Sequence, residues 1–321
     1  MAASLLVPTG RALATQTTPE PWPSAVLMAT GRPGGVYDIY GAAWGRVAAQ
    51  SSGIAIAYRA SGGAAADILL IEQNAAQLGM TTVTVADQAR TGSGSWTAGV
   101  KFSGFRALFP IFPSILQIVT MGSGGITTLA GLSGQPVGIG PMGSSGAAVV
   151  PGILASIGIK PSTLATGDYG PQLDDMKAGK LTACAFIGAP PLPAIQTLAK
   201  TERLGILGFT EAEMAQVARA IPGISAMLIP AGTFARQSTA IASVGTENFA
   251  IGAAHLPDSL ANAITLAGMR NQRDLSRIVP AVHLLNPHMQ PAPGQMGFHP
   301  GAAAALRSLG MDVPAKLVEK S

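Results

Sequence analysis

Cysteine, charged residues and aromatic residues are all scarce in this 321-residue chain, and each scarcity excludes a class of protein. The single cysteine, Cys184, excludes an intrachain disulfide and a cysteine-based zinc site. It lies in the apolar run LTACAFIG, where we expect a buried strand thiol rather than a nucleophile. Charged residues make up 11%, too few for charge-driven disorder. With 5% aromatic residues, scattered Lys and Arg and a net charge of +4, the chain is not predicted to bind nucleic acid.

Catalytic and metal-binding motifs are also missing. The four histidines fall late in the chain without metal-ligand spacing, and one of them, His299, precedes a proline where we expect it to cap a helix; they are His255, His283, His288 and His299. Ser144 and Ser145 lie in GSSG, which is not the G-x-S-x-G nucleophile motif. The sequence therefore predicts no metal, no cofactor and no catalytic residue, and we expect that the protein is not an enzyme.

No membrane-spanning segment is predicted. The most apolar stretch, FRALFPIFPSILQIVTMG, is broken by Pro110, Pro113 and Gln117 and is too short to cross a bilayer. Residues 1–23 combine a short apolar run with an A-x-A site at Ala12–Ala14, but have no basic segment before it. We interpret residues 1–23 as the remnant of a trimmed export signal or as a disordered tail, which predicts a periplasmic protein.

Glycine, by contrast, is abundant, with 40 residues, and it recurs between apolar strands and helices. SAVLMATG, IAIAYRA and AQLGMTTVTV are predicted strands, and glycine loops followed by helices separate them. The pattern restarts with the strand QPVGIG, the loop PMGSSG and the helix GAAVVPGILASIG. Farther on, Thr210 and Glu213 have the spacing of a capping box. This alternation predicts an α/β fold in which each half has a mostly parallel sheet flanked by helices.

Two rounds of this pattern predict two lobes. The C-terminal segment is too short for a domain of its own, so we expect it to rejoin the first lobe, with hinge crossings near Ile118 and Ala242. The predicted division is residues 24–117 plus 242–321 for lobe 1 and 118–241 for lobe 2. Loops at the carboxyl ends of strands from both lobes would then face one cleft, where ligands bind in open α/β sheets.

Three glycine loops are the candidate binding elements: TGRPGGVYDIYG, ASGGAAAD and GPMGSSGAA. Glycine lets a ligand approach the backbone closely, and the first amides of the following helix are unpaired and carry partial positive charge. A carboxylate could accept two or three such hydrogen bonds, each worth roughly 1.5–3 kcal/mol. The loops therefore predict a site for a small carboxylate-bearing solute.

The third loop also matches a dinucleotide fingerprint. Gly138, Gly140 and Gly143 fit G-x-G-x-x-G between a strand and a helix. The acidic residue that should follow about 20 residues later is represented only by Asp168, which is too far along, and Pro151 interrupts the next helix. An NAD-dependent or hydrolytic enzyme on a doubly wound sheet is therefore the alternative hypothesis.

Taken in order, the motifs resemble a known family. TGRPGGVYDIYG, ASGGAAADILLIEQNAAQLGM, GLSGQPVGIGPMGSSG, MKAGKLTACAFIGAPPLPAI and FHPGAAAALRSLGM have the order and spacing of the TAXI family, the solute-binding components of TRAP transporters. The resemblance covers roughly residues 24–311. It implies a two-lobed, hinge-bending periplasmic binding protein, a monomer, that works with a TRAP membrane permease. The implied ligand is a small organic acid or an amino acid such as glutamate.

By motif position, the resemblance also implies a set of substrate-binding residues. They come from the three loops and from later strand ends, and Thr84 and Arg59 complete the set: Gly35, Val36, Tyr37, Arg59, Ser61, Gly62, Gly63, Thr84, Gly143, Ser144, Ser145, Gly188 and Pro190. The chain departs from the family at Asp38, where a second tyrosine is common, and at Arg59. Arg59 either pairs with a second ligand carboxylate or is a solvated or salt-bridged surface residue.

Overall fold

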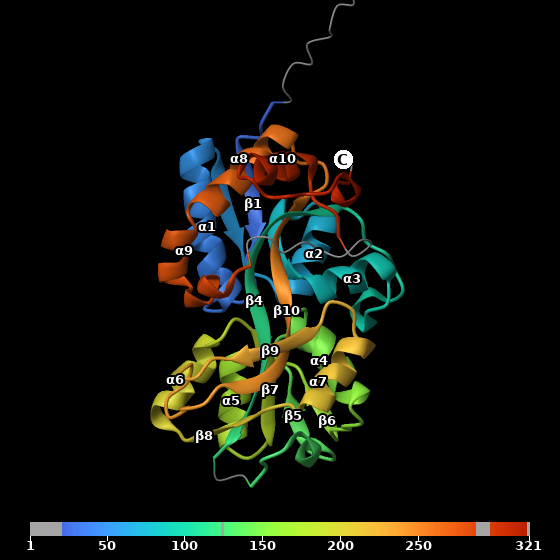
Figure 1. The fold of residues 1–321 in the computed structure, drawn as a ribbon, viewed down its shortest axis with the longest axis vertical. Helices are drawn as coiled ribbons and strands as arrows, with labels where there is room; N and C mark the ends of the chain where they lie inside the picture. The colour runs from blue at the N-terminus through green and yellow to red at the C-terminus, as the bar shows by residue number, and fades with distance from the viewer. Residues whose placement is uncertain (1–20, 123–124, 287–295, 320–321) are drawn as a thin grey trace, which may run out of the picture.

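Two long strands, β4 (Phe105–Met121) and β10 (Ile241–Ala253), run through both halves of the molecule and join two lobes (Figure 1). The computed structural model describes residues 21–122, 125–286 and 296–319. Most of the predicted signal remnant or tail, residues 1–20, and His288 lie outside the described residues. No helix in those three ranges is long and apolar enough to cross a membrane.

Lobe 1 contains the first three strand–loop–helix units and the C-terminal helices. Its strands are β1 (Ala25–Ala29), β2 (Ala55–Arg59) and β3 (Leu78–Thr82). Its helices are α1 (Val36–Ser52), α2 (Ala64–Glu72), α3 (Val83–Thr91), α8 (Asp258–Arg270), α9 (Gln272–Ile278) and α10 (Pro300–Ser308), with 3₁₀ turns at Ser95–Thr97, Pro280–Leu284 and Ala315–Leu317. The C-terminal helices thus pack beside the N-terminal ones, at the top of Figure 1.

Lobe 2 repeats the arrangement with shorter strands. They are β5 (Pro136–Gly138), β6 (Thr163–Ala165), β7 (Ala183–Gly188), β8 (Leu204–Leu207) and β9 (Ser225–Ile229). The helices are α4 (Ser145–Ser156), α5 (Tyr169–Lys177), α6 (Pro193–Thr201) and α7 (Glu211–Ala220), with a 3₁₀ turn at Leu129–Leu132.

One ten-stranded mixed sheet connects the lobes, in the order β2-β1-β3-β10-β4-β7-β5-β6, with β8 paired to β4 and β9 to β10. Pairing is parallel within the strand–loop–helix units, at β1–β2, β1–β3, β5–β6 and β5–β7. It is antiparallel wherever β4 or β10 takes part. The predicted α/β fold is confirmed, and the antiparallel pairs come from the two strands that pass between lobes.

The strands change partners where they pass between lobes. The first residues of β10 pair with β9, and the residues from Asn248 onward pair with β3. In β4, pairing with β7 begins at Ile115. Pro110 and Pro113 lie just before it, opposite Phe249 and Glu247, where the β4–β10 register shifts. Proline cannot donate to a sheet ladder, so its place at an irregular register is the expected one.

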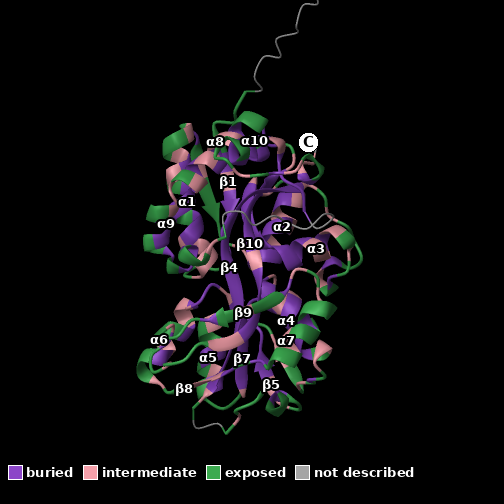
Figure 2. Ribbon diagram, in the orientation of Figure 1, coloured by how far each residue is buried: buried purple, intermediate pink, exposed green. Residues whose placement is uncertain are grey.

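Burial on both faces explains why apolar and polar residues do not alternate along the sequence of β4. All of its residues except Met121 are buried, because lobe 1 helices, lobe 2 helices and neighbouring strands cover both of its faces. In Figure 2 the buried colour follows β4 and β10 through the centre of both lobes. A strand buried on both faces has no reason to alternate apolar and polar residues.

Capping residues recognised in the sequence correctly predicted where two helices begin. Thr210 and Glu213 form the predicted capping box at the start of α7, and His299 caps α10 by accepting a hydrogen bond from the Gly301 amide. The predicted third strand is wrong at its end, since it stops at Thr82. The Thr82 hydroxyl accepts from the Val85 amide and so begins α3, because an N-terminal cap favours helix over continued strand.

Candidate functional site

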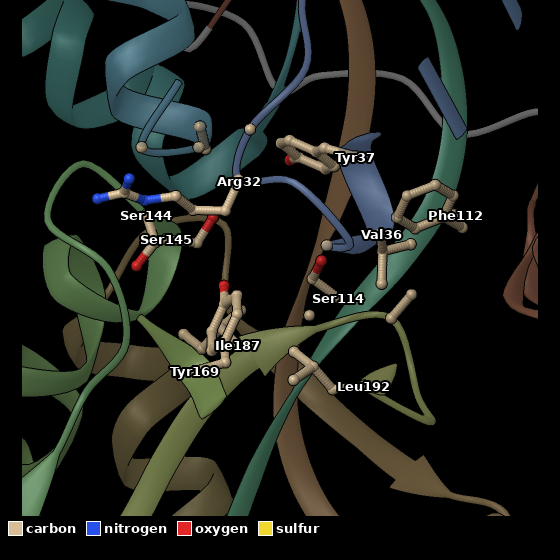
Figure 3. Close-up of a pocket in the computed structure, with 17 residues that line it drawn as sticks. Arg32, Val36, Tyr37, Phe112, Ser114, Ser144, Ser145, Tyr169, Ile187 and Leu192 are labelled. Atoms are coloured by element: carbon tan, nitrogen blue, oxygen red, sulfur yellow. The ribbon is translucent and has the colours of Figure 1, made fainter. Parts of the chain in front are cut away.

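A small cavity lies between the lobes, where the N-termini of α1, α2, α4 and α5 meet. Its volume is about 50 Å³, against roughly 10–15 Å³ needed for one water molecule. Lobe 1 contributes Gly31, Arg32, Gly35, Val36, Tyr37, Gly62, Gly63, Ala64 and Phe112, and the remaining walls are Ser114, Ser144, Ser145, Tyr169, Ile187, Gly188, Ala189 and Leu192 (Figure 3). The cavity therefore suits a solute of a few heavy atoms.

The first glycine loop presents free amides to this cavity. Gly31 has a φ of +72°, a left-handed conformation that favours glycine, and it turns the chain sharply after β1. Gly35 then begins α1 in extended conformation without a side-chain cap. Among the described residues no acceptor binds the Val36 and Tyr37 amides. Unpaired first-turn amides at a helix N-terminus form a site for an anion.

The second loop does something different: it holds the lobes together. The amides of Ala65 and Ala66, in the first turn of α2, donate to the Gly143 carbonyl of lobe 2 at 3.0 and 3.2 Å. The approach requires glycine, because a Cβ on Gly62 would lie 2.1 Å from the Met142 carbonyl oxygen. Two of the α2 amides are thus used for contact between the lobes.

The third loop combines a capped helix start with a buried hydroxyl. Ser144 begins α4, and its side chain accepts from the Ala147 amide at 3.2 Å. Ser145 lines the cavity and is only 7% exposed. Among the described residues neither its hydroxyl nor its amide makes a hydrogen bond. Both groups are available to a solute.

A buried carboxylate supports the two loops of lobe 1. Asp67, in α2, accepts a short hydrogen bond from the Ser61 hydroxyl and another from the Met80 amide at 3.1 Å. The Ser61 oxygen in turn accepts from the Gly31 and Gly63 amides at 3.0 and 3.1 Å. Burial raises the pKa of Asp67 to about 7, although these hydrogen bonds oppose the shift. Ser61 therefore connects the first loop to the second.

Two tyrosines reach the cavity from opposite lobes. The Tyr37 hydroxyl donates to Asn248 Oδ1 at 2.5 Å, and Asn248 donates to the Ser114 hydroxyl at 2.9 Å. Tyr169 points its hydroxyl upward from lobe 2 in Figure 3. Burial raises the pKa of Tyr37 well above its ordinary value and that of Tyr169 to about 12. Both phenols stay neutral near pH 7, so Tyr169 can donate a hydrogen bond to an anion.

An ion pair joins the lobes beside the cavity. Arg32 Nε of lobe 1 lies 3.0 Å from Asp168 Oδ1 of lobe 2, and both side chains are about half exposed, at 44% and 55%. Exposed pairs of this kind contribute roughly 0–1 kcal/mol. The ion pair is therefore a weak contact between the lobes.

The structure brings together most of the predicted site residues. Those that line the cavity are Gly35, Val36, Tyr37, Gly62, Gly63, Ser144, Ser145 and Gly188. Two others stand just behind the wall: Ser61 orders the loops, and Gly143 offers its carbonyl to α2.

The remaining three predicted residues lie elsewhere. Arg59 is exposed at the end of the edge strand β2. Thr84 is buried outside the cavity lining and donates to the Thr246 hydroxyl at 3.0 Å. Pro190 is buried in the turn after β7, between the wall residues Ala189 and Leu192.

Several residues of the cavity wall were not predicted from the sequence. Phe112 and Ser114 come from the middle of β4, Tyr169 begins α5, and Ile187 and Leu192 flank the end of β7. Gly31, Arg32 and Ala64 also line the cavity and lie inside the first two glycine loops, so they could have been proposed from their motifs. The others belong to elements whose approach to the loops depends on how the lobes fold against each other.

The alternative hypothesis of a dinucleotide-dependent enzyme finds little support. The described residues contain no group of three His, Cys, Asp or Glu side chains that could hold a metal ion. Cys184 is buried, as predicted, and burial raises its pKa to about 12. In the dinucleotide-like loop, the Gly143 carbonyl receives the α2 amides. Lobe 1 therefore covers the loop against which a pyrophosphate would have to lie.

The chain is similar in sequence to a known protein family. The model of the NMT1-like family matches residues 28–310. The chain belongs to the NMT1-like family. This match spans both lobes and includes all three glycine loops.

Solved structures with the same fold include a periplasmic transporter, with 13% identity, a TM-score of 0.55 and coverage of 89% of this chain and 92% of the other. A TctC solute-binding protein from Polaromonas has 15% identity, a TM-score of 0.52 and coverage of 89% and 98%. The GluR0 ligand-binding core from Nostoc punctiforme, in complex with L-glutamate, has 16% identity, a TM-score of 0.50 and coverage of 81% and 99%. These likenesses show that this NMT1-like protein has the periplasmic-binding-protein fold.

Proposed function

We propose that this NMT1-like protein is an extracytoplasmic solute-binding protein that captures a small carboxylate-bearing solute by closure of its two lobes. The observation that carries the proposal is the cavity enclosed between the lobes, with the free N-terminal amides of α1 and α4 directed at it. Hydrogen bonds from several such amides can hold a carboxylate without a dedicated arginine clamp.

Closure of the lobes is the proposed mechanism. A solute that contacts both lobes favours the closed arrangement over the open one by the difference in its affinity for the two. The contacts from Ala65 and Ala66 to Gly143 form only when the lobes meet. The closed form is then the one that a membrane partner would recognise.

For the membrane partner we propose a TRAP-type permease, and for the location the periplasm. Support for the permease comes from the ordered motifs that resemble the TAXI family. We also propose that the protein is a monomer and that it is not an enzyme. The residues proposed to contact the solute are those of the predicted set that line the cavity, with Ser61 and Gly143 behind them.

A thermal-shift screen tests the solute-binding function. The panel holds organic acids, amino acids, sugars and NAD, and a bound solute raises the melting temperature in proportion to the logarithm of its concentration over its dissociation constant. We expect carboxylates to stabilise the protein and to reduce its radius of gyration in small-angle X-ray scattering. Stabilisation by NAD and by no organic acid or amino acid would contradict the proposal.

The choice of permease needs a separate test. Transport of the identified solute is measured in vesicles that contain a TRAP permease encoded beside this gene, with and without the purified protein. We expect uptake only when both are present. Uptake that instead requires ATP and an ABC permease would leave the solute-binding function intact and overturn the choice of transporter.

A further inference from the structure

A second hollow opens on lobe 2, apart from the solute cavity. It lies between the end of α6, the strand β8 and the segment that joins β9 to β10, and α6 and β8 are at the lower left of Figure 1. Its volume is about 480 Å³, and it shares no lining residue with the cavity. All of its lining residues lie between Ala199 and Ile241 in the chain, so a partner can occupy it while a solute fills the cavity.

Two arginines without a counter-charge line this lobe 2 hollow. They are Arg203 and Arg236, and none of its lining residues is an aspartate or a glutamate. Among the described residues neither guanidinium forms an ion pair or a hydrogen bond. Glu202, which precedes Arg203 in the chain, pairs instead with Lys177 at 2.6 Å. The lobe 2 hollow therefore carries positive charge that a negatively charged partner can neutralise.

The segment that carries Arg236 is held in a fixed shape. The Gln237 side chain accepts from the Phe234 amide at 3.1 Å. It also donates to the Pro230 and Thr239 carbonyls at 2.9 and 2.8 Å. Arg236 has a φ of +67°, a left-handed conformation that residues other than glycine rarely adopt. Because these hydrogen bonds already order the segment, a partner that binds there loses little affinity to ordering it.

Apolar side chains form another part of the lining. Leu204 and Ile206 of β8 and Ile241 of β10 are half-buried, and they pack against the core of lobe 2. A hydrated inorganic anion gains nothing from such a surface, whereas a peptide segment can cover it with apolar side chains of its own. A lining of two arginines and half-buried apolar residues thus favours a peptide segment that is acidic and partly apolar.

We propose that the lobe 2 hollow docks an acidic segment of the membrane partner. A carboxylate of the partner pairs with each guanidinium, whose planar shape allows two parallel hydrogen bonds to one carboxylate. The proposal rests on the proposed function, which supplies a membrane partner, and it adds where that partner binds and which charge it carries. Exposed charge pairs of this kind raise the rate of association and select the partner, and salt weakens them.

Charge reversal tests the docking site in the transport vesicles described above, with whichever permease, TRAP-type or ABC-type, supports uptake of the solute. The double variant Arg203→Glu/Arg236→Glu places two negative charges where the acidic segment would bind. We expect the concentration of binding protein at half-maximal uptake to rise at least about tenfold. Solute affinity in calorimetry should stay unchanged, because neither residue lines the cavity.

Salt gives an independent measurement of the same contact. For the wild-type protein, the concentration at half-maximal uptake should rise with added sodium chloride, since salt screens the arginines from the acidic segment. The dependence on salt should be lost or reversed in Arg203→Glu/Arg236→Glu.

Lys160→Glu/Arg219→Glu is the matched control. Both residues are exposed on lobe 2 and lie outside the hollow, so this variant changes the net charge equally at other positions. It should support uptake as the wild type does. If the hollow variant shows the wild-type concentration dependence, or if the control is impaired as strongly, the docking proposal is overturned and solute binding stands.

Two further measurements ask whether something else occupies the hollow. Calorimetry with citrate and with inorganic phosphate tests a small anion, and co-sedimentation with phosphatidylglycerol vesicles without permease tests a lipid surface. Binding in either assay that is lost in Arg203→Glu/Arg236→Glu overturns the proposal. If no permease takes up solute with the wild-type protein, the proposal fails together with the transport role, whereas the thermal-shift screen decides solute binding by itself.

Discussion

The first turns of α1 and α2 look alike in sequence, but they do different things in the structure. Each follows a parallel strand of lobe 1 and a glycine loop, and neither has a side-chain cap. The α1 amides at Val36 and Tyr37 face the cavity, whereas the α2 amides at Ala65 and Ala66 bind the Gly143 carbonyl. Similar local motifs therefore differ in the use of their first-turn amides, which are free at the cavity in α1 and hold the lobes together in α2, although Gly62 and Gly63 of the second loop also line the cavity.

The largest expected effect comes from breaking the α2 contact. In Gly62→Ala the new Cβ would lie 2.1 Å from the Met142 carbonyl oxygen, which is backbone and cannot yield easily. We expect solute affinity to fall by about a hundredfold, or about 3 kcal/mol, as measured by calorimetry. Scattering should show the variant open at solute concentrations that close the wild type.

Gly170→Ala is the control for this experiment. Gly170 lies in the first turn of α5, near the same cavity, but no atom lies within 4 Å of a Cβ placed on it. The solute affinity of the Gly170→Ala variant should match that of the wild-type protein. A Gly62→Ala variant that closes and binds normally would contradict the assignment of the second loop to lobe contact.

The next effect comes from cutting the link between the two loops. Ser61→Ala removes the acceptor of the Gly31 and Gly63 amides and leaves the buried Asp67 carboxylate short of one donor. We expect the free energy of unfolding in urea to fall by about 2–3 kcal/mol. Solute affinity should fall as well, because both helix starts lose their orientation. A loss of stability with unchanged affinity would show that the link serves folding alone.

Raising the pH should destabilise the fold reversibly, because it ionises the buried Asp67 carboxyl group. Burial raises the pKa of Asp67 to about 7 from its ordinary 3.8. Between these values the folded protein holds a proton that the unfolded chain has lost, so stability falls as the pH rises towards 7. We expect the free energy of unfolding to drop by about 2–3 kcal/mol between pH 5 and pH 8, relative to Asp67→Asn. Parallel pH profiles for the two proteins would contradict this role of Asp67.

The smallest effect should come from the loop that faces the solute. Arg32→Gln removes the exposed ion pair with Asp168 beside the cavity. We expect the free energy of lobe closure to become less favourable by less than about 1 kcal/mol. Small-angle scattering at increasing solute concentrations measures this change. A loss as large as that of Gly62→Ala would mean that the first loop, too, is a main contact between the lobes.

Sequence reasoning predicted the periodic parts of the fold well. The strands β1, β2, β5 and β7 and the helices that follow the glycine loops were expected, because each strand is short, apolar and bounded by glycine. The long strand β4 was not recognised, since burial on both faces removes alternation. The sequence DSLANAITLAGMRNQRDL predicts one long helix, whereas the structure has two, α8 and α9, separated at Asn271.

For the site, motif position identified the glycine loops but not their partners. Gly63 and Ser145 were expected at the cavity and lie there. Phe112 and Tyr169 gave no local signal, because neither lies in a glycine loop and each reaches the cavity from an element whose place depends on the closed lobes.

The sequence by itself determined the order of the secondary-structure elements: strand, glycine loop and helix, repeated in two halves. Propensity, capping and glycine conformation are local, so they can be recognised from neighbouring residues. Tertiary structure alone decided which helix start leaves its amides free at the cavity and which uses them to bind the other lobe. It also decided that Ser61, which donates to Asp67, ties the two loops by accepting from the Gly31 and Gly63 amides. The reason is physical: an unpaired amide is the same donor in every loop, and only the folded neighbours determine which acceptor comes within reach.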